Sequence, residues 1–135
     1  MTKEEKRALI YYGFNEESVF LEAATFAESN DLTLIGEFGD IREDDGSDMD
    51  YVIDGLMYWI EEEEVEHIMI TSLVAFGRNV IEAIKIKDEL HSMGVCVWLM
   101  NTCSRTLNDD GTVNEIAEKV FTLLKENYYF ENKNQ

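Results

Sequence analysis

The stretch of sequence that decides the fold covers residues 67–100 and reads HIMITSLVAFGRNVIEAIKIKDELHSMGVCVWLM. Its first part, His67–Leu73, is an apolar run that predicts a buried strand, and the apolar spacing over Val80–Met93 predicts a helix. Gly94 fits the glycine that commonly follows a helix, and Val95–Met100 predicts the next strand. A strand, a helix and a second strand in this order are typical of the crossover unit of a parallel sheet.

The same alternation of strands and helices continues on both sides of this unit. The further elements that the pattern predicts are a strand over Ala8–Phe14, a helix that starts near Asn15, a strand over Leu32–Phe38, a helix over Val52–Ile60 and a last helix from about Thr112 to about Tyr128. Residues 39–48 contain two glycines and five acidic residues and predict a loop. We therefore expect an α/β fold. It consists of one domain, residues 1–135, with an open, mainly parallel sheet, helices on both faces and a flavodoxin-like strand order.

Charge and composition narrow the function. The 135 residues include 29 Asp and Glu against 11 Lys and Arg, which gives a net charge of −18. Such an excess of acid repels phosphate backbones, so we expect no direct binding to duplex DNA. No apolar run is long enough to span a bilayer and the charged N-terminus is unlike a signal peptide, so we expect a cytoplasmic protein that does not enter a membrane. The two cysteines are too few for a disulfide framework, and we interpret Cys96 as a buried thiol and Cys103 as a loop thiol.

The sequence predicts neither a metal site nor a cofactor. The acidic residues of the loop do not have the spacing of a calcium site, because the first and last ligand positions would be Ile41 and Val52. His67 and His91 lack a cysteine or carboxylate partner at zinc spacing, so we interpret both as histidines at the surface or at the end of an element. No Gly-rich phosphate-binding loop follows the first strand, which disfavours a flavin or nucleotide site.

Several segments resemble the serine recombinases of the resolvase and invertase type, in which a strand leads into Asp-Arg-Leu-Gly-Arg followed by Ser or Asn. Residues 76–79, Phe-Gly-Arg-Asn, keep the second half of this motif, whereas Val74 and Ala75 replace its Asp-Arg pair. Residues 11–15, Tyr-Tyr-Gly-Phe-Asn, are similar to the family's Tyr-x-Arg-x-Ser, which carries the nucleophile. Three further segments occupy family positions in the same order, namely the acidic loop Asp40–Ser47, the strand entry His91–Val95 and the turn Asn108–Thr112. The resemblance extends over Ala8–Glu126 and implies the fold of a resolvase catalytic domain.

The resemblance also implies which residues would carry the chemistry. Family members attack a DNA phosphodiester with a serine hydroxyl, and arginines hold the phosphate. In this chain the nucleophile position holds Asn15, two arginine positions hold Gly13 and Ala75, and Arg78 is retained. The resemblance therefore implies no intact catalytic site. Arg78 with Asn79 stays a candidate for binding an anion, and the alternative is that Arg78 pairs with a surface carboxylate.

These departures favour a catalytically inactive, serine-recombinase-like domain that acts through protein–protein interaction, with regulation of DNA recombination as the expected setting. Two alternatives stay open. The first is a site-specific recombinase that is active, or completed by another subunit, and exchanges DNA strands through a phosphoserine intermediate. The second is an acidic protein that mimics DNA. The family's DNA-binding domain would follow Glu126, where few residues remain, so we expect a catalytic-domain shell without that domain.

The last predicted helix has more apolar side chains than one packing face requires. The set expected to pack on the sheet is Val113, Ile116, Ala117, Val120, Phe121 and Leu124. Leu123 lies outside this stripe, and Tyr128, Tyr129 and Phe130 continue beyond it. In the resembled family this region leads into the helix through which subunits pair. We therefore expect these four residues to form an interface, in a homodimer or with another protein. The alternative is that the tail folds back onto its own domain.

Overall fold

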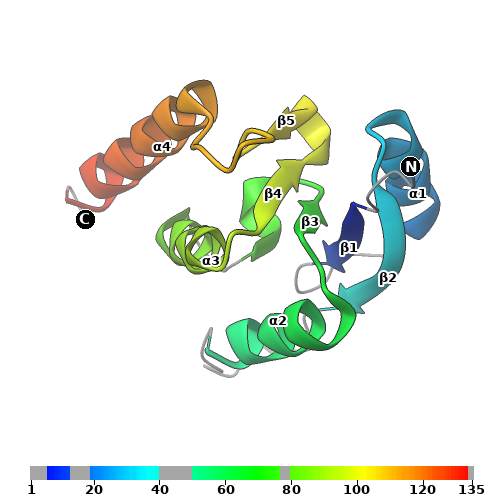
Figure 1. The fold of residues 1–135 in the computed structure, drawn as a ribbon. Helices are drawn as coiled ribbons and strands as arrows, with labels where there is room; N and C mark the ends of the chain where they lie inside the picture. Colours follow the sequence, from blue (N-terminus) through cyan, green and yellow to red (C-terminus); the bar gives the residue numbers. More distant parts are fainter. Residues whose placement is uncertain (1–5, 13–18, 40–49, 77–79, 134–135) are drawn as a thin grey trace.

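The computed structural model describes residues 6–12, 19–39, 50–76 and 80–133, and Figure 1 shows their arrangement. The strands are β1 (Arg7–Tyr12), β2 (Thr33–Gly39), β3 (His67–Ile70), β4 (Cys96–Leu99) and β5 (Ser104–Arg105). The helices are α1 (Phe20–Ser29), α2 (Asp50–Glu63), α3 (Val80–Ser92) and α4 (Glu115–Lys133), with two short 3₁₀ helices, η1 (Leu73–Phe76) and η2 (Met100–Thr102). Strands and helices alternate through most of the chain, as the sequence predicts.

The strands form one sheet in the order β2-β1-β3-β4-β5. The neighbours from β2 to β4 run parallel, and β5 runs antiparallel to β4. This arrangement confirms the predicted open, mainly parallel α/β sheet and its flavodoxin-like strand order. The sequence pattern predicts no strand at β5, because a strand of two residues has no alternation to detect.

Strand side chains alternate between two hydrophobic cores, one on each face of the sheet. On one face, Ile10 and Met69 pack with Ala27 of α1. On the other face, Ile68 packs in a core to which α2, α3 and α4 contribute, with Leu56 of α2 fully buried. Figure 1 shows α1 on its own side of the sheet, α2 and α3 on the other side, and α4 outside α3. The helices therefore cover both faces, as predicted, but unequally.

A buried lysine joins α4 to α3. Lys87 of α3 has 1% of its side chain exposed, and its Nζ lies 3.0 Å from the Asp88 carboxylate and 3.3 Å from the Glu118 carboxylate of α4. The same Nζ lies 4.5 Å from the centre of the Phe121 ring, which is itself buried. Two carboxylates and an aromatic face offset the cost of removing the ammonium group from water. These contacts hold the first half of α4 on the domain.

The ends of α4 differ from the predicted ones. The Asn114 side-chain oxygen accepts hydrogen bonds from the backbone N–H groups of Ile116, at 3.1 Å, and Ala117, at 3.3 Å, and so caps the helix. The predicted start near Thr112 is therefore early. Thr112 belongs to a turn in which its hydroxyl and its backbone N–H donate to the Asp110 carboxylate. The helix also continues to Lys133, beyond its predicted end.

Two other predicted boundaries concern the sheet and the first helix. The strand predicted to reach Leu73 ends at Ile70, and η1 follows it. A run of apolar residues does not distinguish the end of a buried strand from a buried helical turn, which accounts for the difference. The predicted helix start at Asn15 lies outside the described residues, and α1 is described from Phe20.

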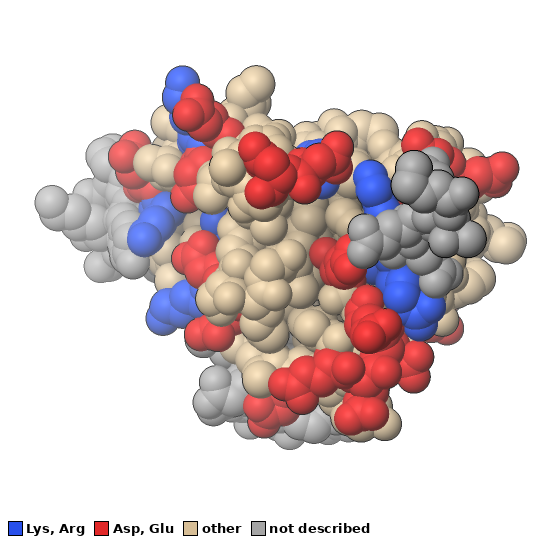
Figure 2. Space-filling model, viewed as in Figure 1, with Lys and Arg blue, Asp and Glu red and all other residues tan. Residues whose placement is uncertain are grey.

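Acidic side chains are prominent on the surface, in line with the net charge of −18. In Figure 2 they gather along the lower edge of the molecule, over α2, which ends in the sequence Glu61-Glu62-Glu63. Such a concentration of carboxylates makes this face unsuitable for contact with another polyanion. Among the described helices, none has the length and apolar character needed to cross a membrane.

Candidate functional site

The residues that the resemblance implies for the functional site follow β1 and β3, at the carboxyl ends of these strands. These strands are neighbours, and β2 lies on the other side of β1, so the order of the chain reverses between β1 and β3. In open α/β sheets, ligands bind at such a point. The predicted site residues Gly13, Asn15, Arg78 and Asn79 lie outside the described residues, as does the acidic loop 40–47. The described residues on either side define the surroundings of the site.

Ala75 occupies a position at which serine recombinases have an arginine, and it is one of the described residues. It lies in η1, and 6% of the residue is exposed. Its side chain belongs to the same core as Ile70 of β3 and Ala83 of α3. Its backbone N–H donates to the carbonyl of Ser72 at 3.1 Å. This position therefore contributes to the core and supplies no positive charge to the edge of the sheet.

Two tyrosines end β1, one on each face of the sheet. Tyr11 is fully buried, and its ring stacks on Phe38 with the ring centres 5.8 Å apart. Tyr12 is nearly buried and donates a hydrogen bond from its phenol group to the Glu37 carboxylate. No lysine or arginine occurs in the described segments at this edge, which are 11–12, 36–39, 70–76 and 99–103. These segments supply rings and a carboxylate rather than the cations that a phosphodiester requires.

Fewer side chains of α4 are buried than the sequence predicts. Ala117 and Phe121 are buried, as predicted. The prediction is wrong for Val113, Ile116 and Val120, which are 44%, 78% and 47% exposed. The helix lies against α3 at the side of the domain and not across the sheet. Only a narrow face of α4 therefore contacts the domain and is buried.

The exposed apolar side chains lie along one side of the helix and at one position two residues before it, and we call them the α4 ridge: Val113, Ile116, Val120 and Leu123. Within the helix, Ile116, Val120 and Leu123 are spaced by four and three residues, which is the spacing of a seam between paired helices. Leu123 is 61% exposed, which agrees with its predicted place outside the packed stripe. Tyr128 is half-buried, and the side chains of Tyr129 and Phe130 lie outside the described part of the chain.

A groove of about 440 Å³ lies beside the α4 ridge, between α4 and the body of the domain. Its apolar lining comes from Val120 and Leu124 on α4 and from Leu73 and Leu99 on the sheet side. The exposed thiol of Cys103, in the loop position that the sequence predicts, lies among its polar lining residues. Ile116 and Val120 belong both to the ridge and to the groove lining, so the two features adjoin each other. Exposed apolar side chains that gather in this way are typical of a surface that binds another protein.

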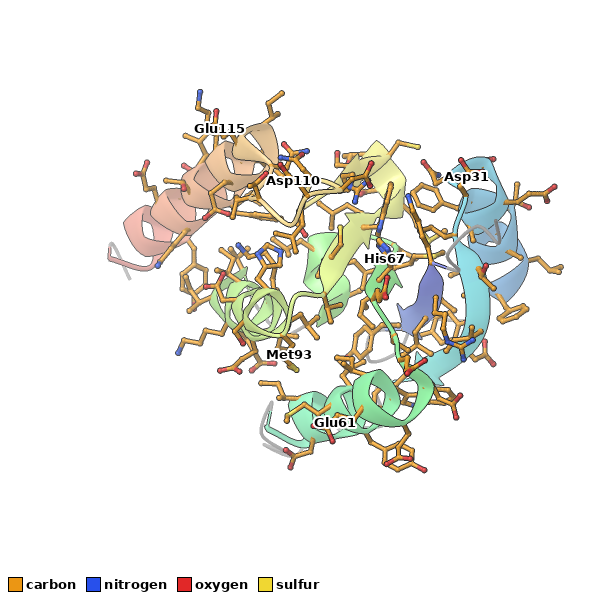
Figure 3. All side chains as sticks on the ribbon, viewed as in Figure 1. Asp31, Glu61, His67, Met93, Asp110 and Glu115 are labelled. Carbon is orange, nitrogen blue, oxygen red and sulfur yellow. The ribbon has the colours of Figure 1, made fainter. Side chains whose placement is uncertain are left out.

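His67 is buried, so of the two predicted places, the surface or the end of an element, the surface is wrong. It lies at the start of β3, as Figure 3 shows, so its predicted place at the end of an element is confirmed. The Trp98 indole N–H donates to His67 Nδ1 at 3.0 Å, which accounts for a histidine that is 7% exposed. Within the described residues, no group of three or more His, Cys, Asp or Glu side chains could hold a metal ion.

We expect His67 to stay neutral down to unusually low pH. Burial, and then the charges of Arg105 and Lys6, lower the pKa of His67 from 6.5 to about 4. In the unfolded chain the His67 ring takes up a proton near pH 6.5, whereas in the folded chain it does so only near pH 4. The folded state therefore loses stability as the pH falls from 6.5 towards 4, and the full stabilisation from the neutral ring is present above pH 6.5. An NMR titration of the ring carbons measures the pKa, and the His91→Gln variant assigns the signal because the chain has two histidines. An inflection near 6.5 would contradict the buried, neutral ring.

Comparison with known proteins identifies the fold. No protein-family model and no curated protein matches the chain. The N-terminal catalytic domain of TP901-1 integrase aligns with a TM-score of 0.67 at 17% identity, over 96% of this chain and 99% of that domain. A resolvase-family site-specific recombinase from Streptococcus pneumoniae aligns with a TM-score of 0.64 at 15% identity, over 96% of this chain and 90% of the recombinase. The chain therefore has the fold of these recombinase catalytic domains, which confirms the resemblance seen in the sequence.

Proposed function

We propose that this chain is a catalytically inactive, serine-recombinase-like domain that acts by binding protein, in the setting of DNA recombination. The observation that carries the proposal is Asn15 at the position of the nucleophile. A serine attacks a phosphodiester through an oxygen that loses its proton and later leaves again as an alkoxide. A carboxamide provides no such nucleophile. The covalent step of the recombinase reaction therefore has no group to perform it at this position.

The missing arginines support the same conclusion. An arginine that holds the phosphate also stabilises the charge that develops in the transition state, and removing one such donor commonly lowers the rate by about 10²–10³-fold. Gly13 and Ala75 replace two of these residues, and Ala75 is part of the core. The described segments at this edge of the sheet contribute no other cation. A single compensating side chain would not rebuild this environment.

The α4 ridge is the surface through which we propose that the domain binds protein. Its partner is a second copy of the chain or another protein of the same fold. In a two-fold homodimer the ridges of two copies pack on each other. Lys119 and Glu126 are exposed residues on the same side of α4, and both line a shallow surface hollow beside Leu123. Charged residues that flank the apolar seam of two paired helices can form favourable charge pairs at its rim.

We expect no binding of the isolated chain to duplex DNA at physiological salt. The net charge of −18 opposes the approach of phosphates, and this repulsion grows as salt is removed. Fluorescence anisotropy of a labelled duplex, titrated with protein at physiological and at low salt, measures the binding. Micromolar affinity that strengthens at low salt would reveal a cationic DNA-binding surface and would count against the proposal.

A further inference from the structure

A second pocket lies at the opposite edge of the sheet, where the parallel strands begin. It has a volume of about 470 Å³, which is within the size range of small-molecule sites. Its base is formed by the buried residues His67, Cys96 and Leu107, and its rim includes Lys6, Arg105 and Asp109. Figure 3 shows His67 between β1 and β4 on this edge. The pocket is separate from the predicted catalytic position, which lies at the carboxyl ends of the same strands.

Two cations share one carboxylate at the rim of this pocket. Arg105 Nη1 lies 2.9 Å from Asp109 Oδ1, and Lys6 Nζ lies 3.6 Å from the same oxygen. The guanidinium group of Arg105 also lies 4.7 Å from the centre of the Trp98 ring, and its Nε donates to the carbonyl of Leu107. The arginine is therefore held in place independently of Asp109. The Asp109 side chain is 75% exposed, so its ion pairs add little to stability and another anion can replace it at low cost.

The base of the pocket supplies a directed hydrogen-bond donor. Because Nδ1 of His67 accepts from the Trp98 indole, the proton of the neutral ring is on Nε2. Among the described residues none accepts a hydrogen bond from Nε2, and the ring lines the pocket. The Nε2–H group is thus free to donate to a ligand.

Two cations and two carboxylates line the pocket, Lys6 and Arg105 against Glu66 and Asp109, and the cations dominate at the His67 ring. Arg105 and Lys6 both lower the pKa of His67, and each has a larger effect than the opposing effect of Asp109. A fixed guanidinium, an ammonium group and a neutral N–H donor therefore converge on one space. This combination of charged and neutral donors is the chemistry that recognises an oxyanion.

We propose that this amino-edge pocket binds a small molecule through its carboxylate or phosphate group. Asp109 holds the anion position beside Arg105 and Lys6 and moves aside when the ligand pairs with these two cations. His67 Nε2–H donates to the same ligand group or to a neighbouring oxygen. The proposed function uses α4 and does not depend on this site.

The Trp98 indole N–H provides a reporter for this binding, because it donates to the ring at the base of the pocket. We expect inorganic phosphate and acetate, added separately to the full chain at constant ionic strength with chloride as the reference, to shift its NMR signal in a saturable way. Tighter binding of phosphate indicates a phosphorylated ligand, and tighter binding of acetate indicates a carboxylate ligand. The Lys6→Gln variant should bind the better of these two anions roughly tenfold more weakly than the natural chain. The Lys85→Gln variant, changed on the exposed side of α3, should bind this anion with the affinity of the natural chain.

Two neighbouring aspartates give the sharpest comparison. Asp109→Asn removes the internal competitor and should tighten binding of the better probe roughly tenfold. Asp110→Asn makes the same change in net charge, but the Asp110 carboxylate accepts from Thr112 and holds neither cation, so its affinity should be unchanged. The proposal is overturned if neither anion gives a saturable shift, or if the two asparagine variants bind equally well.

Discussion

Replacing Ile116 and Leu123 together with aspartate is expected to convert a dimer into a monomer. Both side chains lie on the α4 ridge, at 78% and 61% exposure, so the change leaves the core of the domain intact. Each residue occurs twice in a two-fold interface, and burying one large aliphatic side chain contributes about 1.5–3 kcal/mol. Losing these contacts and burying like charges should weaken the dimer by roughly a thousandfold or more. Sedimentation velocity over a range of micromolar concentrations measures the change.

The matched control for this variant is Leu21→Asp. Leu21 is 79% exposed on α1, on the other side of the sheet from the ridge, so the same chemical change should leave the dimer intact. Two results would contradict an interface at the α4 ridge. The natural chain would sediment as a monomer at every concentration, or the α1 and α4 variants would weaken the dimer equally. The sequence also predicts that Tyr129→Ala with Phe130→Ala weakens the dimer. This prediction concerns side chains that lie outside the described residues.

The sequence predicts the fold well because the central strands are short, apolar and separated by clear helical patterns. Burial of all four residues in β3 and in β4 is what a parallel sheet with both faces covered requires. The pattern fails where an element is too short to have a period, as in β5. It also fails at η1, where an apolar run continues through a change from strand to 3₁₀ helix.

The exposed face of α4, the buried lysine and the pocket at His67 depend on tertiary contacts, which the sequence pattern does not reveal. The pattern of α4 has apolar residues on more than one face, and only the contact with α3 decides that Phe121 is buried and Ile116 is exposed. Lys87 is fully buried because carboxylates on two helices meet its ammonium group. His67 and Arg105 are far apart in sequence, so only the sheet brings them to one pocket. By contrast, the departures at Asn15 and Ala75 are visible in the sequence, since they depend on residue type.

The Asn15→Ser variant is expected to remain as inactive as the natural chain. It restores a hydroxyl group at the nucleophile position but not the guanidinium groups that Gly13 and Ala75 replace. The absence of two such donors lowers the rate by about 10⁴-fold or more relative to an intact site. Adding Ala75→Arg would not correct this, because Ala75 is 6% exposed and the larger side chain would disrupt the core rather than reach the phosphate. Covalent attachment to DNA therefore requires more than one substitution.

Catalytic inactivity is tested most directly by an assay for a covalent adduct with supercoiled plasmid DNA. The natural chain and Asn15→Ser are incubated with the plasmid, denatured and separated by electrophoresis, with an active recombinase on its own recombination site as the positive control. We expect an adduct for the positive control and neither an adduct nor a nicked plasmid for the two forms of this chain. A denaturant-resistant protein–DNA adduct with either form would contradict catalytic inactivity, because the site would then have a working nucleophile and the charges to support it.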